Sequence, residues 1–149
     1  MKWFKFIIYF QLFASALLNL LSGISTLTGG QYGSSGDAEM VYTAFSGLKT
    51  LDVLYGVCAI ALAAGDIFVR MRLAGYRANA PKLYLGVLAA AVVLSLIYII
   101  GVFVILGEWA DIIDLTAVVS QYTSQLFVSI IMIGANHVYF KKRAHLFVN

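Results

Sequence analysis

The sequence predicts an all-α membrane protein, in which residues 1–149 form one antiparallel bundle of four transmembrane helices. Three observations predict this fold class. First, 62% of the 149 residues are hydrophobic and only 11% are charged, whereas soluble domains are about half apolar and a quarter charged. Second, four apolar stretches are each long enough to cross a bilayer. Third, the basic residues beside these stretches fall almost entirely on one side, which predicts that both termini are cytoplasmic.

The expected helices come from four stretches of mostly apolar residues, at about 4–28, 47–69, 83–106 and 114–140. A hydrocarbon core of about 30 Å needs roughly 20 helical residues, and each stretch is long enough. Backbone groups in lipid must be paired within the protein, and these runs are continuous rather than alternating, so helices are favoured over a β-barrel. The first apolar run is longer than that of a signal peptide, so we expect this helix to be retained.

The segments between the stretches differ in charge. Segment 29–46 is an outer loop rich in Gly and Ser, segment 70–82 is a basic loop, and segment 141–149 is a basic tail. Of the ten Lys and Arg residues, only Lys49 falls on the outer side, and we expect the membrane to be a bacterial cytoplasmic membrane. Basic residues at a membrane surface attract anionic lipid headgroups at about 1 kcal/mol each. The residues expected to make such contacts are Arg70, Arg72, Arg77, Lys82, Lys141, Lys142 and Arg143.

Small and polar side chains recur at helical spacing along the first two stretches. They form an expected packing stripe of Gln11, Ser15, Ser22, Gly56, Ala59 and Ala63. Lipid cannot hydrogen-bond amides and hydroxyls, and small residues let helices approach closely, so we expect the two halves of the stripe to face each other. In the fourth stretch, Gln121, Gln125 and Asn136 share one face. We expect this face, which also carries Val128, to point inward, and the third stretch to be the most exposed to lipid.

Asp52 is the strongest candidate for a ligand or ion site. A carboxylate inside a membrane span is expensive to ionise in lipid, which makes it a functional candidate by default. From the helical rise, Asn19 and Gln121 are expected at a similar depth, with Gln125 one turn further, and together they could form a polar pocket open to the outside. The alternative is a structural Asp52 that reaches the interface and pairs with Lys49.

Other candidate residues have plainer expected roles. Asp66 lies four residues before Arg70, which predicts an ion pair on one helix face. Cys58 is the only cysteine, so an intrachain disulfide or a Cys-based metal site is excluded, and packing is its expected role. No catalytic residue, metal site or cofactor is predicted. Nucleic-acid binding is not predicted either, because the basic residues occur in short clusters beside apolar stretches.

Three functions stay open at this point. The first is an interaction or assembly protein that acts through helix contacts with a second copy or another membrane protein. The alternative is an oligomeric small transporter or channel with a polar site at Asp52, Asn19 and Gln121. In size and number of spans the chain is similar to small four-helix exporters, but its first stretch carries Gln11 and Asn19 and no carboxylate, so it is not assigned to that family. A membrane-embedded enzyme ranks last, because no reactive set of residues is present.

Overall fold

A computed structural model of the chain describes residues 2–107 and 115–148, and the side chains of these residues except 115–122 and 125. Nearly all of this described part is helical, and it contains no strand. In chain order the elements are α1 (Lys2–Phe6), the π-helical turn η1 (Ile7–Gln11), α2 (Leu12–Thr28), the 3-10 turn η2 (Gly30–Tyr32), α3 (Ser35–Ala44), α4 (Ser46–Ala74), α5 (Ala80–Leu106), α6 (Leu115–Lys141) and the 3-10 turn η4 (Ala144–Leu146).

Three helices are long and apolar enough to cross a membrane, namely the continuous helix Lys2–Thr28, α4 and α5. The all-helical class and three of the four predicted stretches are therefore confirmed. The fourth stretch corresponds to α6, which has 27 residues and whose described apolar part is Leu126–Lys141. Among the three long helices, α5 is the least buried, with 17% of its most apolar window buried against 28% and 39% for the others.

The connection between α4 and α5 is shorter than the predicted basic loop. α4 continues through Arg70 and Arg72 because both guanidinium groups lie over aromatic rings, 4.5 Å from the centre of Phe13 and 5.0 Å from the centre of Phe68. Such cation–π contacts let an arginine stay on the side of a helix with its apolar stem covered. α5 begins early, with Pro81 in its first turn, where the missing N–H would have no helical partner anyway.

Segment 29–46, which the sequence predicts as a loop, folds into η2 and α3. Gly29 ends α2 with a φ of 72°, and a Cβ on Gly29 would lie 2.6 Å from the Cβ of Ala38. Both the left-handed backbone and the close approach therefore require glycine at this turn. Ser34 begins α3 with a capping box, in which its hydroxyl accepts from the Asp37 N–H and the Asp37 carboxylate accepts from the Ser34 N–H.

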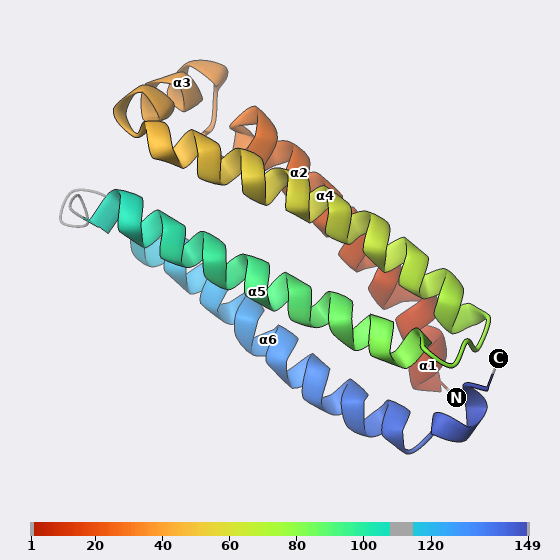
Figure 1. Ribbon diagram of the computed structural model, residues 1–149. Coiled ribbons are helices and arrows are strands. Elements are labelled where there is room, and N and C mark those ends of the chain that lie inside the picture. The colour runs from red at the N-terminus through yellow and green to blue at the C-terminus, as the bar shows by residue number, and fades with distance from the viewer. Residues whose placement is uncertain (1, 108–114, 149) are drawn as a thin grey trace.

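The helices are arranged as two antiparallel pairs side by side (Figure 1). α2 packs most extensively on α4, α4 packs on α5, and α5 packs on α6. Both termini lie at the same end as the connection between α4 and α5, and α3 lies at the opposite end (Figure 1). We call the end with both termini the basic end, because it holds the connection 75–79 and the tail 141–148. All seven expected headgroup contacts therefore lie at or near one end of the molecule.

Two glycines form the closest contact between α2 and α4, and one of them, Gly56, belongs to the expected packing stripe. A Cβ on Gly23 would lie 2.8 Å from the Gly56 carbonyl oxygen, and a Cβ on Gly56 would lie 2.9 Å from the Gly23 carbonyl oxygen. The two backbones can touch here only because both residues are glycine. Ala59 and Ala63 are buried on the same side of α4. The other members of the predicted stripe are partly buried: Gln11, Ser15 and Ser22.

The middle of α6 is packed on one side only. Phe127, Val128, Ile130 and Ile131 are between 58% and 66% exposed, although they point in several directions around the helix. The expectation that Val128 faces inward is wrong, because α6 packs principally on α5 and makes no comparable contact with α2 within the described residues. Asn136, on the same predicted face but nearer the basic end, is buried as expected.

Candidate functional site

Asp52 is fully buried near the start of α4 and accepts four hydrogen bonds. Its Oδ2 accepts from Gln31 Nε2 at 2.9 Å, from the Tyr32 hydroxyl at 2.8 Å and from the Tyr42 hydroxyl at 3.0 Å. Its Oδ1 accepts from the Tyr98 hydroxyl at 2.9 Å. A carboxylate has about four acceptor positions, so these neutral donors, which we call the Asp52 cluster, meet its hydrogen-bonding capacity.

The four donors of the Asp52 cluster come from three different elements. Gln31 and Tyr32 belong to η2, Tyr42 belongs to α3, and Tyr98 belongs to α5. The turn at Gly29 and the cap of α3 bring the first three donors back over the start of α4. The Asp52 carboxylate consequently ties α3, η2 and α5 to α4 at the end of the bundle opposite the basic end.

No described cation neutralises Asp52. Lys49, the expected partner, instead places its ammonium 5.9 Å from the centre of the Tyr42 ring. The predicted pair of Asp52 with Lys49 is wrong, because Asp52 faces the interior of the bundle and the Tyr42 hydroxyl covers the carboxylate. Burial raises the pKa of Tyr42 to about 12, and the nearby Asp52 charge and hydrogen bond add to the effect. Burial, followed by the hydrogen bond to Asp52, also raises the pKa of Tyr32 well above its ordinary value.

Further contacts surround the buried Asp52 carboxylate, whereas its donor Gln31 is exposed. The Thr26 hydroxyl lies 3.3 Å from Gln31 Oε1, and Thr26 itself is buried. The Tyr32 and Tyr42 rings meet edge to face with centres 5.6 Å apart. A hollow of about 470 Å³ beside α3 has Tyr42, Glu39 and Lys49 in its lining but does not include Asp52. The carboxylate is therefore closed off in this conformation, in contrast to the open pocket that the sequence analysis expected.

Asn19 does not join Asp52, and that part of the predicted site is wrong. Asn19 Nδ2 instead donates to Asp66 Oδ2 at 3.0 Å. The contact of Gly23 with Gly56 sets the register of the antiparallel pair. Residues before Gly23, such as Asn19, lie beside residues after Gly56, whereas Asp52 lies beside the end of α2. Gln121 and Gln125, the other predicted members, have side chains outside the described part.

Asp66 forms a second buried carboxylate site, about 21 Å along α4 from Asp52 at 1.5 Å per residue. It is 1% exposed and accepts from Ser15 Oγ at 2.7 Å as well as from Asn19. The predicted ion pair with Arg70 is wrong, because the guanidinium lies over Phe13 and α2 supplies the donors. Fourteen residues bring a helix back to within about 40° of the same direction, so both carboxylates face the same side of α4.

Asn136 joins the amino terminus to the end of α6. It is fully buried, accepts from Trp3 Nε1 at 2.9 Å, and donates to the Tyr84 hydroxyl at 3.1 Å and the Met132 carbonyl at 2.8 Å. The helical phase of Asn136 predicted that it points inward but indicated no partner for it. The indole of Trp3, a residue 39% exposed at the basic end, supplies this donor.

No family model, curated protein or solved structure matches this chain. The site is therefore interpreted from its geometry alone. Within residues 2–107 and 115–148, no group of three or more His, Cys, Asp or Glu side chains is placed to hold a metal ion. The described interior holds two carboxylates with neutral donors and one amide with three partners, and these hydrogen bonds join the helices to one another.

Proposed function

We propose that this chain is a multi-pass protein of a bacterial cytoplasmic membrane that crosses the bilayer four times, with both termini in the cytoplasm. The length of α6 supports a fourth crossing, because 27 helical residues correspond to about 40 Å at 1.5 Å per residue. The gathering of basic residues at one end, with Lys49 at the other, supports the orientation, because Lys and Arg in short loops stay cytoplasmic.

The orientation can be tested by labelling introduced cysteines in a Cys58→Ser background. With a membrane-impermeant maleimide on intact cells, we expect Glu39→Cys to react, and Arg77→Cys and Lys142→Cys to react only after the cells are opened. Glu39, Arg77 and Lys142 are exposed, so each substitution leaves the core unchanged. Labelling of Arg77→Cys and Lys142→Cys from opposite faces would contradict the four crossings.

We further propose that the protein acts by assembly, through helix contacts with a second copy or another membrane protein. The observation that carries this proposal is an apolar groove of about 540 Å³ between α4 and α5, with Cys58, Ala61 and Gly65 on one side and Ala90 on the other. In a membrane, small residues allow the backbone of a neighbouring helix to approach closely. The buried Asp52 carboxylate adds support, because it already accepts four hydrogen bonds within the chain.

Assembly can be measured as the number of copies per particle in liposomes, by photobleaching of a fluorescent label. Ala61 is exposed and lines the groove, so Ala61→Phe should fill the groove and shift the chain toward monomers by at least tenfold in dissociation constant. Val57 is 56% exposed but does not line the groove, so Val57→Phe is a matched control that should leave assembly unchanged. A chain that is monomeric at every protein-to-lipid ratio, with both variants alike, would contradict assembly with itself.

A transporter or channel is the second candidate, and one observation favours it. Asp52 and Asp66 lie on the same side of α4, both fully buried, and no described cation neutralises either. Ionisable residues in this position mark ion or proton pathways in many membrane proteins. This reading requires the hydroxyl of Tyr42 to leave Asp52 during transport. If the chain transports, we expect Asp52→Asn to abolish flux in proteoliposomes without loss of folding. If the chain only assembles, the native chain and Asp52→Asn should show the same flux. A membrane-embedded enzyme stays the least supported of the three.

A further inference from the structure

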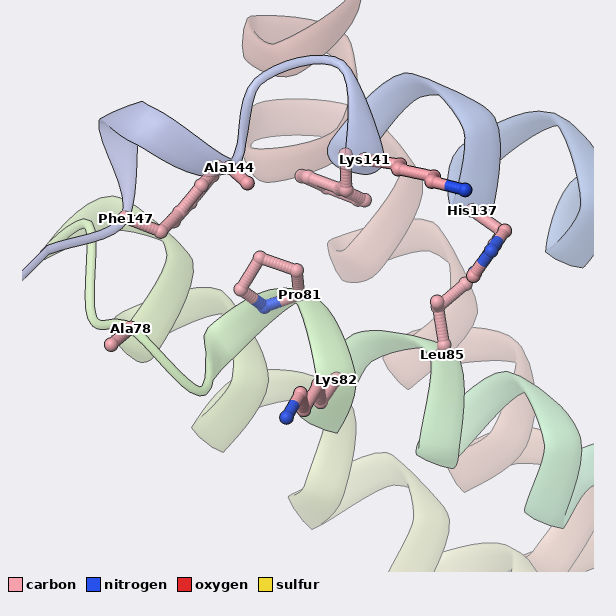
Figure 2. Close-up of a pocket in the computed structure, with 9 residues that line it drawn as sticks. Ala78, Pro81, Lys82, Leu85, His137, Lys141, Ala144 and Phe147 are labelled. Atoms are coloured by element: carbon pink, nitrogen blue, oxygen red, sulfur yellow. The ribbon is translucent and has the colours of Figure 1, made fainter.

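A hollow of about 490 Å³ lies between the start of α5 and the end of α6, at the basic end. Lys82 comes from α5, and His137 and Lys141 come from α6. Leu85 and the rings of Phe140 and Phe147 add apolar walls. Figure 2 shows His137 and Lys141 on the α6 side of the hollow, opposite Pro81 and Lys82 on the α5 side.

We propose that this hollow, called the phosphate pocket below, binds the phosphate of an anionic phospholipid. The inference rests on the membrane placement proposed above, which sets the basic end at the level of the lipid headgroups. Basic pockets between membrane helices on the cytoplasmic side are suited to anionic headgroups, because each amine near the surface attracts them.

The charges around the phosphate pocket favour an anion. Lys82 and Lys141 each bring a full positive charge, and no Asp or Glu lines the pocket. The start of α5 adds about half a positive charge from its helix dipole, and the end of α6 adds about half a negative charge, so these two effects cancel. The two amines therefore make the net charge around the pocket positive, and His137 offers a further nitrogen for hydrogen bonding.

The apolar walls favour a lipid over free phosphate. Phe140 and Phe147 are 3% and 7% exposed, and their rings meet edge to face with centres 5.6 Å apart. Phe147 also packs on Phe4, with ring centres 5.8 Å apart, so η4 folds the tail back and fixes this wall. A free phosphate would gain nothing from phenyl rings, whereas the glycerol and first acyl carbons of a phospholipid would be partly removed from water.

Retention of lipid by the purified full-length chain tests the proposal, with native mass spectrometry as the readout. The probes are a phosphatidylglycerol and a phosphatidylcholine with identical acyl chains, added at equal concentration. Lys82 and Lys141 are exposed, so Lys82→Ala with Lys141→Ala should fold normally. The matched control is Lys5→Ala with Lys142→Ala, which removes the same charge at the basic end from exposed residues that do not line the pocket.

We expect the pocket variant to lose about twenty-five-fold in phosphatidylglycerol affinity, from about fivefold for each amine, and the control to stay within about threefold. Equal losses in both variants would overturn the proposal, since only general charge would matter. Displacement by inorganic phosphate at the same molar concentration would overturn the lipid assignment. If the native chain stays with membranes in flotation but binds both lipids equally, the phosphate pocket is refuted and the membrane placement is not. If the chain leaves the membrane fraction, the proposed membrane placement is refuted.

Discussion

Tyr98 and Tyr32 offer a sharp test of the Asp52 cluster, because each donates one hydroxyl to the same carboxylate. Within the described residues, Tyr98 is the donor to Oδ1, whereas Oδ2 accepts from three donors. Tyr98→Phe keeps the ring and its packing on Tyr55, whose centre lies 4.5 Å away, but removes the donor to Oδ1. Tyr32→Phe removes an identical atom and leaves Oδ2 with two donors.

The expected difference follows from what each variant leaves unpaired. A hydrogen bond to a charged group contributes about 1.5–3 kcal/mol, and a buried acceptor that loses its partner also loses its solvation. We therefore expect Tyr98→Phe to lower the free energy of unfolding by about 3 kcal/mol and Tyr32→Phe by about 1 kcal/mol. In an Asp52→Asn background the acceptor is neutral, so Tyr98→Phe should cost only about 1 kcal/mol, which gives a coupling energy of about 2 kcal/mol.

Equilibrium unfolding in mixed micelles, followed by circular dichroism, can measure all of these variants. The native chain, Tyr98→Phe, Asp52→Asn and the double variant form a double-mutant cycle that isolates the pairwise interaction. Two results would refute the reasoning. One is a difference between Tyr98→Phe and Tyr32→Phe below about 0.5 kcal/mol, and the other is a coupling energy near zero.

Three further predictions concern Tyr42, Gly56 and Trp3. The pKa of Tyr42 is raised to about 12 from an ordinary value of 10.0, so the unfolded chain releases this proton at a lower pH than the folded chain. The contribution of the Tyr42 hydroxyl to the free energy of unfolding should therefore be complete below pH 10 and lost by pH 12. Unfolding experiments should show it as a difference between the native chain and Tyr42→Phe that shrinks over this range. Gly56→Ala should lower the free energy of unfolding by about 1–3 kcal/mol, because its Cβ would lie 2.9 Å from a carbonyl oxygen of α2, whereas Gly86→Ala, with nothing within 4 Å, should be neutral or stabilising in thermal melts. Trp3→Phe should destabilise the chain by about 1–3 kcal/mol and speed proteolysis of its amino terminus, because Asn136 Oδ1 loses its donor; unchanged proteolysis would contradict this role.

Much of the helical framework could be predicted because it depends on local patterns. The length of each apolar run and the recurrence of small residues such as Gly56, Ala59 and Ala63 are visible in the sequence; the structure buries all three residues and places Gly56 against α2. The ends of helices were predicted less well, because arginines were expected in loops. Cation–π contacts with distant rings, such as that of Arg70 with Phe13, are not visible in the local pattern.

The partners of Asp52 could not be predicted from hydrophobic periodicity. Gln31, Tyr32 and Tyr42 lie in segment 29–46, whose Gly and Ser composition is typical of a loop. One signal was present, since Ser34 followed three residues later by Asp37 is the pattern of a helix cap, and it would have indicated α3. The return of that helix over Asp52 depends on the turn at Gly29, whose geometry no local pattern specifies.

By itself, the sequence placed Asp52 and Asp66 in a long apolar helix, on a face expected to point inward because lipid cannot satisfy a carboxylate, but it left open an interfacial Asp52 paired with Lys49. Only the tertiary structure decided which donors each one meets. Asn19 binds Asp66 rather than Asp52 because the contact of Gly23 with Gly56 sets how far α2 lies along α4. That register depends on the fit of two surfaces far apart in the chain, whereas the inward direction depends on the solvent around a single helix.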